Sequence, residues 1–558
     1  MLPCDAGIVE PSLATEGFMN QGKAERQKTR RIERLNERRE REHAARDLVM
    51  VSMAATDPFS HYASYRHGPR RFTIHVGPTN SGKTHDALEA LRKAGSGAYL
   101  APLRLLALET GERLRADGLP TDIITGEERS LDGDGRFISQ TIGTLDLERE
   151  YACVVIDEAQ MIDDPQRGGS WTRAILGVDA RDIHVCCSPE AADVVTQLVV
   201  MCGDRYTLVR HERSTPLVVE DRPWDGVARP GDAVIVFSRQ DVLRTAARIE
   251  EEGTSTAVVY GSLPWTARRS EAMRFASGEA RVLVATDAIG MGMNLPIRRV
   301  IFGATSKYDG SSNRRLTPLE VRQIAGRAGR LGMFDRGLVT VDARSNDWLR
   351  RRLTQQAPSI ATARLPFPFE LGLDETAPLT AILKAWANAP TRYDLLERSS
   401  LSLERTIAAR LESIAGSRTA FPYDRETLLR MSFLPVDGQK ELDEVVSLFN
   451  GLTKRVHPML PGGAEWEELF ASEPDGLRTL ERDLRTVSLR FAFASSLDLM
   501  DDAMEKAFDR TRERWERAVI AKVAGPKASL IDSRMYGRPE WDDWEDGKDP
   551  YTDGAWRF

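Results

Sequence analysis

Apolar residues between positions 71 and 345 occur in short β-branched runs that alternate with stretches of helical periodicity. The runs FTIHVG, GAYLAP, CVVIDEAQ and HVCCSP are followed later in the chain by DAVIVFS, STAVVYG, ARVLVATD and RRVIFGA. Runs of this length that end in polar, glycine or proline turns are typical of buried parallel strands joined by helices. We therefore predict two successive α/β domains, residues 71–213 and 214–345. Ligands of such domains bind beyond the carboxyl ends of the strands.

The composition and the pattern of apolar residues change on both sides of these domains. Residues 1–70 form a charged N-terminal extension, and its run GKAERQKTRRIERLNERREREHAARD predicts a solvated helix or a disordered arm. Residues 526–558 are acidic and aromatic, and we expect a flexible tail whose tryptophans dock on a partner or on the chain's own core. Residues 346–525 predict a helical accessory domain with core stripes of Leu442, Val445, Val446, Phe449 and Leu452, then Leu477, Leu480, Leu484, Val487 and Phe491.

Composition narrows the class of protein without naming an activity. The 558 residues are 41% hydrophobic and 29% charged, as in a soluble globular protein, and we find no apolar run long enough to span a membrane. The five cysteines show no zinc spacing, which favours buried reduced thiols. The net charge of −7 does not exclude a local nucleic-acid groove. The first residues lack a secretory signal and carry acids, so we expect a cytoplasmic protein.

A phosphate-binding loop follows the first predicted strand. The sequence GPTNSGKT matches G-x-x-x-x-G-K-[ST] between the strand FTIHV and the helical stretch HDALEALRKA. Its backbone N–H groups and the N-terminus of that helix are expected to bind the phosphates of ATP. We expect Lys83 to reach the outer phosphates and the Thr84 hydroxyl to bind Mg²⁺. The predicted nucleotide contacts are Gly77, Pro78, Thr79, Asn80, Ser81, Gly82, Lys83 and Thr84.

Two acids end the strand in CVVIDEAQ. Asp157 at the strand tip is placed to hold Mg²⁺ through water, and Glu158 is placed to act as general base for the attacking water. Together with the phosphate loop, these residues predict ATP hydrolysis.

The second α/β domain carries QIAGRAGR, in which Gln323, Arg327 and Arg330 are the polar positions. We expect the two arginines to lie on one face of a helix and to act as arginine fingers across a cleft between the domains. Such a finger is typically worth about 10³–10⁵ in rate. We expect Gln323 to position the γ-phosphate or the water. A hydrolytic site shared by two domains indicates a motor rather than a P-loop metabolic enzyme.

At this point the motif series resembles a superfamily-two helicase. The segments APLRLLA, TGEE, CCSPEA, VFSRQ and ATDAIGMGMN stand where that family has its strand-contact, coupling and second-domain motifs. The resemblance implies two tandem RecA-like P-loop domains with parallel sheets. It implies that nucleic-acid contacts come from Arg104, Thr125, Gly126, Ser238 and Thr286, and that the turn near the nucleotide is shaped by Asp287, Gly290 and Gly292.

The tetrad Asp157-Glu158-Ala159-Gln160 and the stretches MIDDPQRGGSWTRAILG and VVYGSLPWTARRSEAMRFASGEA are similar to the Suv-three type of RNA helicase and its bacterial relatives. That resemblance implies an ATP-dependent enzyme that moves 3′ to 5′ on single-stranded RNA, unwinds partly duplex RNA and works with an exoribonuclease. Gln160 is expected to couple the two domains through its amide. No glutamine precedes the phosphate loop in HYASYRHGPRRFT, so we expect other nucleoside triphosphates to be accepted.

Two other functions remain open on the sequence alone. A DNA helicase or translocase would use the same two ATP-hydrolysing domains, because the strand-contact motifs bind phosphates and sugars. An ATP-gated RNA clamp would bind RNA without unwinding it. The sequence leaves the oligomeric state open, and it leaves open whether the N-terminal extension grips RNA.

Overall fold

The computed structural model describes residues 39–50, 57–126, 129–131, 134–290, 295–308, 312–330, 332–415, 424–434, 436, 438–453, 476–497 and 499–530. The predicted tail after residue 530, Cys4 and Gly292 lie outside these residues. None of the described helices is both long and apolar enough to span a membrane. The described cysteines carry free thiols, and Cys153, Cys186 and Cys187 are buried.

The first sheet contains eight strands, all parallel to their neighbours except the edge strand β4. Buried apolar runs form its central strands because both faces are covered by helices. Its order is β4 (Arg129–Ser130), β3 (Thr121–Ile124), β5 (Phe137–Thr141), β2 (Gly97–Ala101), β6 (Glu150–Ile156), β7 (Asp179–Cys187), β1 (Arg71–Val76) and β8 (Arg205–Arg210).

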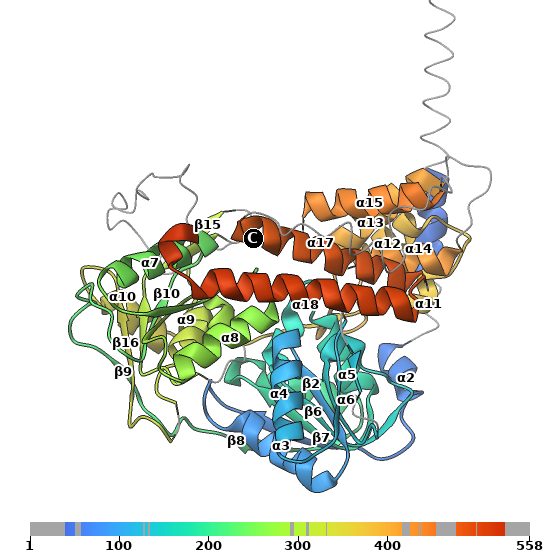
Figure 1. Cartoon of the computed structure of the whole chain (residues 1–558). Helices are drawn as coiled ribbons and strands as arrows, with labels where there is room; N and C mark the ends of the chain where they lie inside the picture. The colour runs from blue at the N-terminus through green and yellow to red at the C-terminus, as the bar shows by residue number, and fades with distance from the viewer. Residues whose placement is uncertain are drawn as a thin grey trace, which may run out of the picture.

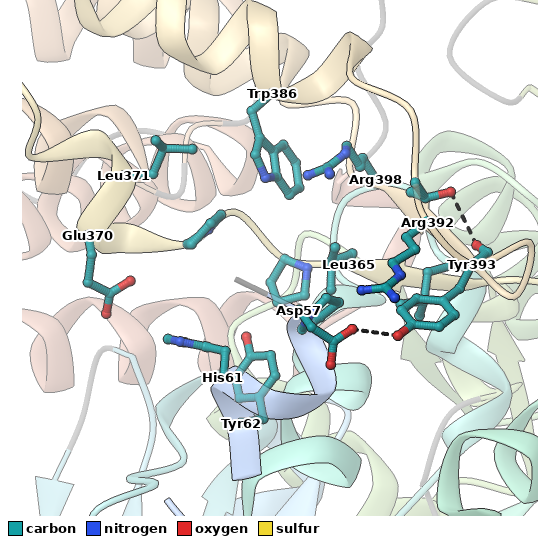
Figure 2. A pocket seen from close by; sticks show the side chains of 15 residues that line it. Asp57, His61, Tyr62, Leu365, Glu370, Leu371, Trp386, Arg392, Tyr393 and Arg398 are labelled. Atoms are coloured by element: carbon teal, nitrogen blue, oxygen red, sulfur yellow. Dashed lines mark hydrogen bonds between the residues drawn. The ribbon is translucent and has the colours of Figure 1, made fainter. Parts of the chain in front are cut away.

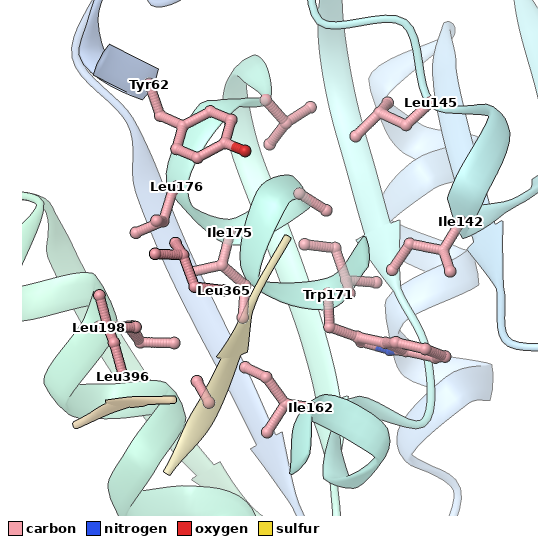
Figure 3. Packing of buried hydrophobic residues seen from close by; sticks show 14 of the residues in the cluster. Tyr62, Ile142, Leu145, Ile162, Trp171, Ile175, Leu176, Leu198, Leu365 and Leu396 are labelled. Carbon is pink, nitrogen blue, oxygen red and sulfur yellow. The ribbon is translucent and has the colours of Figure 1, made fainter. Parts of the chain in front are cut away.

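Helices cover the two faces of this sheet with separate apolar clusters. One face packs against α3 (Lys83–Ala94) and α4 (Arg104–Ala116). The other packs against α2 (Pro58–Ala63), α5 (Gly169–Gly177) and α6 (Ala192–Met201), and Trp171 is fully buried in this cluster (Figure 3). Short 3₁₀ turns follow three strands: η1 (Ile142–Thr144), η2 (Ala159–Asp163) and η3 (Pro189–Ala191).

The second sheet contains six parallel strands. Its order is β11 (Thr256–Val259), β12 (Val282–Ala285), β10 (Asp232–Ile235), β13 (Arg299–Phe302), β16 (Gly337–Val341) and β9 (Leu217–Val219). The domain also contains α7 (Arg239–Glu251), α8 (Trp265–Ala276), η4 (Asp287–Gly290), the hairpin β14 (Ser306–Tyr308) and β15 (Asn313–Arg315), α9 (Pro318–Ala325) and α10 (Asp347–Thr354). The prediction of two tandem α/β domains with parallel sheets is confirmed.

The helical region contributes to the cores of both α/β domains. It contains β17 (Ala363–Leu365), α11 (Phe369–Gly372), α12 (Leu379–Asn388), β18 (Leu396–Arg398), α13 (Ser402–Ala415), α14 (Arg425–Ser432), α15 (Gln439–Thr453), α17 (Leu477–Ser496), α18 (Asp502–Ala524) and η5 (Lys527–Leu530). The parallel pair β17 and β18, together with α12, packs on the first domain, where Leu365 and Leu396 lie near Leu198 (Figure 3). Helices α17 and α18 pack on the second domain, and in Figure 1 α18 extends from that domain towards the other helices of the helical region.

The predicted core stripes therefore divide between two clusters. Leu442, Val445 and Phe449 are buried among helices α13, α14, α15 and α17. Leu480 and Leu484 instead cover α7 and α8 of the second domain. The last part of the charged N-terminal run also differs from its prediction. Residues 39–50 form a helix with Ala45 and Val49 buried in the core of the first domain, so this part is not a fully solvated helix.

Candidate active site

The phosphate loop connects β1 to α3 and curves around the ammonium of Lys83. Its Nζ donates to the carbonyl oxygens of Gly77 and Pro78, at 2.6 and 2.8 Å. Gly82 stands at the N-cap of α3 with φ of +85°, a left-handed conformation that glycine adopts without steric cost. Asn80 also has a positive φ, of 62°. The loop thus places the Lys83 ammonium beside the N-terminus of α3, where anions are favoured.

Asp157 lies at the carboxyl end of β6 and accepts hydrogen bonds from three side chains. Thr84 Oγ1 donates to Asp157 Oδ1 at 3.0 Å, and the Tyr99 hydroxyl donates to Oδ2 at 2.8 Å. Burial, and next the charge of Glu158, raises the pKa of Asp157 to about 6. The indole N–H of Trp171 donates to the Asp157 carbonyl oxygen at 2.9 Å. The two predicted metal-binding residues, Thr84 and Asp157, are therefore adjacent, and both offer the hard oxygen ligands that Mg²⁺ takes.

Glu158 and Gln160 form a linked pair after the strand. The Gln160 amide N–H donates to Glu158 Oε2, while Gln160 Oε1 accepts from the backbone N–H of Ser188 at 3.2 Å. Both partners belong to the first domain, so the amide of Gln160 does not make the expected bridge to the second domain. An ion pair between the domains is formed two residues beyond Ser188, where Glu190 pairs with Arg322 Nη2 at 2.7 Å.

Arg327 and Arg330 do not lie on a helix. The prediction that they share one helical face is wrong, because α9 ends at Ala325 and Gly329 then takes a φ of +70°. Gln323, still on α9, and Arg327 both donate to the carbonyl oxygen of Gly290, each at 3.2 Å.

Arg327 faces the acids of the first domain. Burial lowers the pKa of its guanidinium, and the carboxylates of Glu158, Asp157 and Glu109 oppose that shift. An arginine from the second domain is therefore held in the field of the two strand-end acids.

Direct contacts close the cleft around these groups. The Asn80 side-chain amide donates to the Gly329 carbonyl oxygen at 2.9 Å. Leu105, at the start of α4, joins the apolar cluster of the second domain. Arg269 of α8 pairs with Glu112 of α4. The turn of residues 326–330 carries Arg327 and Arg330 and is called the arginine-bearing turn below. The phosphate loop and this turn thus face each other across the cleft.

The predicted nucleic-acid contacts lie at or near the carboxyl ends of strands. Thr125 and Gly126 follow β3, and Thr286 follows β12 and is 8% exposed. Ser238 caps α7, where its hydroxyl contacts Asp241 Oδ2 at 2.6 Å. Arg104 begins α4.

Arg104 and Asp287 make further contacts beside the cleft. The Arg104 charge adds to burial in lowering the pKa of Arg268 on α8, which places the two arginines near each other across the domains. Asp287, which was expected to shape the turn near the nucleotide, pairs with Lys307 at 2.9 Å.

Sequence reasoning missed several residues that shape this site. Tyr99 and Trp171 hold Asp157 from the buried side, and Arg213 of the interdomain linker reaches the arginine-bearing turn. Their partners are backbone atoms or distant side chains, so no local motif signals them.

A separate cavity of about 290 Å³ lies away from the cleft (Figure 2). Its lining combines aromatic side chains from α2 and the helical region with arginines, among them Tyr62, Trp386, Tyr393, Arg392 and Arg398. The lining includes none of the phosphate-loop or strand-end acids, so this cavity is not the candidate active site. Among the described residues, no cluster of three or more His, Cys, Asp or Glu side chains is arranged to hold a metal ion.

Comparisons with known proteins agree with this geometry. Residues 58–211 match the DEXQ-box helicase domain of Suv3, and residues 225–332 match the helicase conserved C-terminal domain. The chain is 43% identical over 291 residues to the mitochondrial DExH-box ATP-dependent RNA helicase DExH16 of Arabidopsis thaliana, covering 51% of each chain. It is 41% identical over 308 residues to the mitochondrial ATP-dependent RNA helicase SUPV3L1 of Homo sapiens, covering 53% of this chain and 39% of the relative.

The matched region spans about half or less of the length of these relatives. The prediction of a cytoplasmic location is wrong on this comparison, since the relatives are named as mitochondrial proteins. Acidic residues near the start of the sequence, on which that prediction depended, do not exclude an organelle. The two α/β domains carry the matched sequences, the phosphate loop, the DEAQ tetrad and the arginine-bearing turn. Residues 58–211 therefore form a domain of the Suv3 DEXQ-box helicase type, and residues 225–332 form a helicase C-terminal domain.

Proposed function

We propose that this protein is an ATP-dependent RNA helicase that moves along single-stranded RNA and unwinds partly duplex RNA. One observation carries the proposal most directly. Thr84, Asp157 and Glu158 of the first domain and Arg327 of the second face the same cleft. A hydrolytic site shared by two domains couples ATP binding and hydrolysis to their closing and opening, and this coupling is what a motor needs.

In this mechanism the first domain binds and polarises the nucleotide. Lys83 leaves the loop carbonyls for the outer phosphates. Thr84 and Asp157 would hold Mg²⁺, and the ion would supply positive charge to the phosphate oxygens when bound. Glu158 accepts a proton from the attacking water, and Gln160 fixes the orientation of that carboxylate.

The second domain completes the site. Arg327 and Arg330 stabilise the charge that develops on the transferred phosphoryl group. Gln323 holds the loop at Gly290 and helps to place the γ-phosphate. Because the fingers come from the opposite domain, hydrolysis requires closure, and release of phosphate permits opening.

The RNA would lie across the carboxyl edges of both sheets. Arg104, Thr125, Gly126, Ser238 and Thr286 contact its sugar–phosphate backbone, which positions a strand without reading its sequence. Binding that depends on phosphates weakens steeply as salt rises. By resemblance to the family, we propose 3′-to-5′ movement and cooperation with an exoribonuclease in RNA turnover. Because no glutamine precedes the phosphate loop, we also propose that nucleoside triphosphates besides ATP are accepted.

The test is steady-state ATP hydrolysis by the full chain without nucleic acid, with single-stranded RNA and with single-stranded DNA. We expect strong stimulation by RNA and its loss in Glu158→Gln, which keeps the shape of the side chain but cannot accept the proton. Stimulation by DNA and not by RNA would replace the proposal with a DNA translocase. RNA binding without stimulated turnover or strand separation would replace it with an ATP-gated clamp.

A further inference from the structure

Arg213 belongs to the segment that joins the two α/β domains, between β8 and β9. Its guanidinium donates to four backbone carbonyl oxygens. The Nε atom donates to Thr215 at 2.6 Å, and Nη1 donates to Gly326 at 2.6 Å and to Thr79 at 3.3 Å. The Nη2 atom donates to Ala328. One side chain therefore connects the linker, the phosphate loop and the turn that follows α9.

The carbonyl oxygens that accept hydrogen bonds from Arg213 are arranged for a planar cation with several N–H donors. Gly326 is the C-cap of α9, and carbonyl oxygens at a helix C-terminus carry partial negative charge. A guanidinium offers five N–H donors in a fixed plane, so it can hold two carbonyls of one turn together. A lysine ammonium at this position could satisfy one or two of these oxygens but could not reproduce the planar geometry.

The turn from Gly326 to Gly329 carries Arg327 and leads directly to Arg330. On the side that faces the first domain, three backbone carbonyl oxygens of the turn accept hydrogen bonds. Arg213 donates to those of Gly326 and Ala328, and the Asn80 side chain donates to that of Gly329 at 2.9 Å. Its second-domain side is held by the Gly329 N–H, which donates to the Ile297 carbonyl oxygen at 2.8 Å. The position of this turn, and hence of the arginines, depends on contacts from both domains.

We propose that Arg213 is a positioning residue for the two finger arginines: it fixes the Gly326–Gly329 turn against the phosphate loop when the domains close. The inference rests on the proposed ATP hydrolysis at the interdomain cleft. Arg213 does not touch the reacting atoms. It acts chiefly through the turn, because its bond to the Thr79 carbonyl of the phosphate loop, at 3.3 Å, is longer than its bond to Gly326, at 2.6 Å. Its loss therefore moves the fingers more than it moves the first-domain contacts to the nucleotide.

The first test compares Arg213→Met and Arg213→Lys with wild type in RNA-stimulated ATP hydrolysis. Arg210→Met, at an exposed position at the end of β8, is the matched control. We expect kcat to fall at least about tenfold in both Arg213 variants, a part of what removing a finger costs. The KM for ATP and the affinity for RNA should stay within about threefold of wild type, as expected for an interaction made in the transition state. A wild-type kcat in Arg213→Lys would overturn the argument from the planar fork.

A double-mutant comparison separates positioning from a general effect on the fold. Arg213→Met is introduced into a background in which both fingers are replaced, Arg327→Ala with Arg330→Ala, and single-turnover hydrolysis is measured. If Arg213 acts through the fingers, the second change lowers the rate by less than about twofold, because residues that act as a unit are not additive. A further tenfold fall would overturn the proposal. Arg213→Lys keeps the length and charge and remains testable if Arg213→Met unfolds. A wild-type chain without ATP hydrolysis would refute the proposed function itself, whereas an active wild type with unaffected Arg213 variants would refute this inference alone.

Discussion

The ion pair between Glu190 and Arg322 joins the two domains beside the ATP site. Glu190 lies in η3, just after Ser188, and Arg322 lies on α9, just before Gln323. Glu190 Oε1 and Arg322 Nη2 are 2.7 Å apart, and the side chains are 13% and 29% exposed, so the pair is largely shielded from solvent. Arg322 also donates to the Gln355 carbonyl oxygen at 3.0 Å. We predict that replacing Glu190 by Gln or Arg322 by Met destabilises the closed arrangement of the domains.

The size of the effect follows from the contact. A hydrogen bond to a charged group is worth about 1.5–3 kcal/mol, and about 1.4 kcal/mol corresponds to a tenfold change in an equilibrium constant. Removing the pair should therefore shift the closure equilibrium by roughly tenfold to a hundredfold. Because ATP is held by both domains only when they are closed, the shift should appear as a comparable rise in the KM for ATP.

Steady-state kinetics of the two single variants, the double variant and the charge swap Glu190→Arg with Arg322→Glu would measure this coupling. We expect the double variant to be no worse than either single variant, and the charge swap to recover part of the loss. Single variants with a KM within about twofold of wild type would refute the reasoning. Independent, additive effects of the two changes would refute it as well, since they would show that the side chains do not act on each other.

Three further predictions concern the packing around the site. Trp171→Phe should lower the free energy of unfolding by about 1–3 kcal/mol in denaturant titrations, because the buried carbonyl of Asp157 loses its indole donor; unchanged stability would show that this bond is not needed. His75 has its pKa lowered to about 4, chiefly by burial, so it stays neutral in the fold while the unfolded chain takes up a proton. Stability should therefore fall as pH drops from about 6.5 to about 4, and His75→Gln should flatten that part of the pH–stability curve; an equally steep curve in the variant would contradict this. Gly329→Ala should reduce ATP turnover severely, because φ is +70° and a Cβ would lie 2.5 Å from the Gly337 backbone nitrogen; normal turnover would show that the turn can shift without cost.

The strands and motifs of the two α/β domains were readable because their signals are local. A buried parallel strand is an apolar run with a turn at its end, and Asp157 and Glu158 stand at such an end in the sequence itself. The phosphate loop is recognisable because its glycines, lysine and threonine act within eight consecutive residues. Local chemistry of this kind needs no knowledge of distant partners.

The errors arose where spacing was taken to imply a conformation. The three-residue spacing of Arg327 and Arg330 suggested a helical face, but the chain between them is a turn whose carbonyls are bound by Arg213 and Asn80. Gln160 was expected from its place in the motif to bridge to the second domain, yet its amide N–H donates to Glu158 and its amide oxygen accepts from the Ser188 N–H. Hydrogen-bond partners depend on which groups folding brings near, and that information is not periodic.

The parallel strands, the phosphate loop and the two strand-end acids could be predicted from the sequence alone, because hydrophobic period and turn chemistry act between near neighbours in the chain. The packing of helices α17 and α18 on the second domain, and of α12 on the first, is apparent only in the folded chain. An apolar helical stripe shows that a face is buried but not what buries it. The same reason explains the pairing of Glu190 with Arg322 and the bonds from Arg213 to Gly326 and Ala328, because these partners lie more than a hundred residues apart in the chain and are selected by packing.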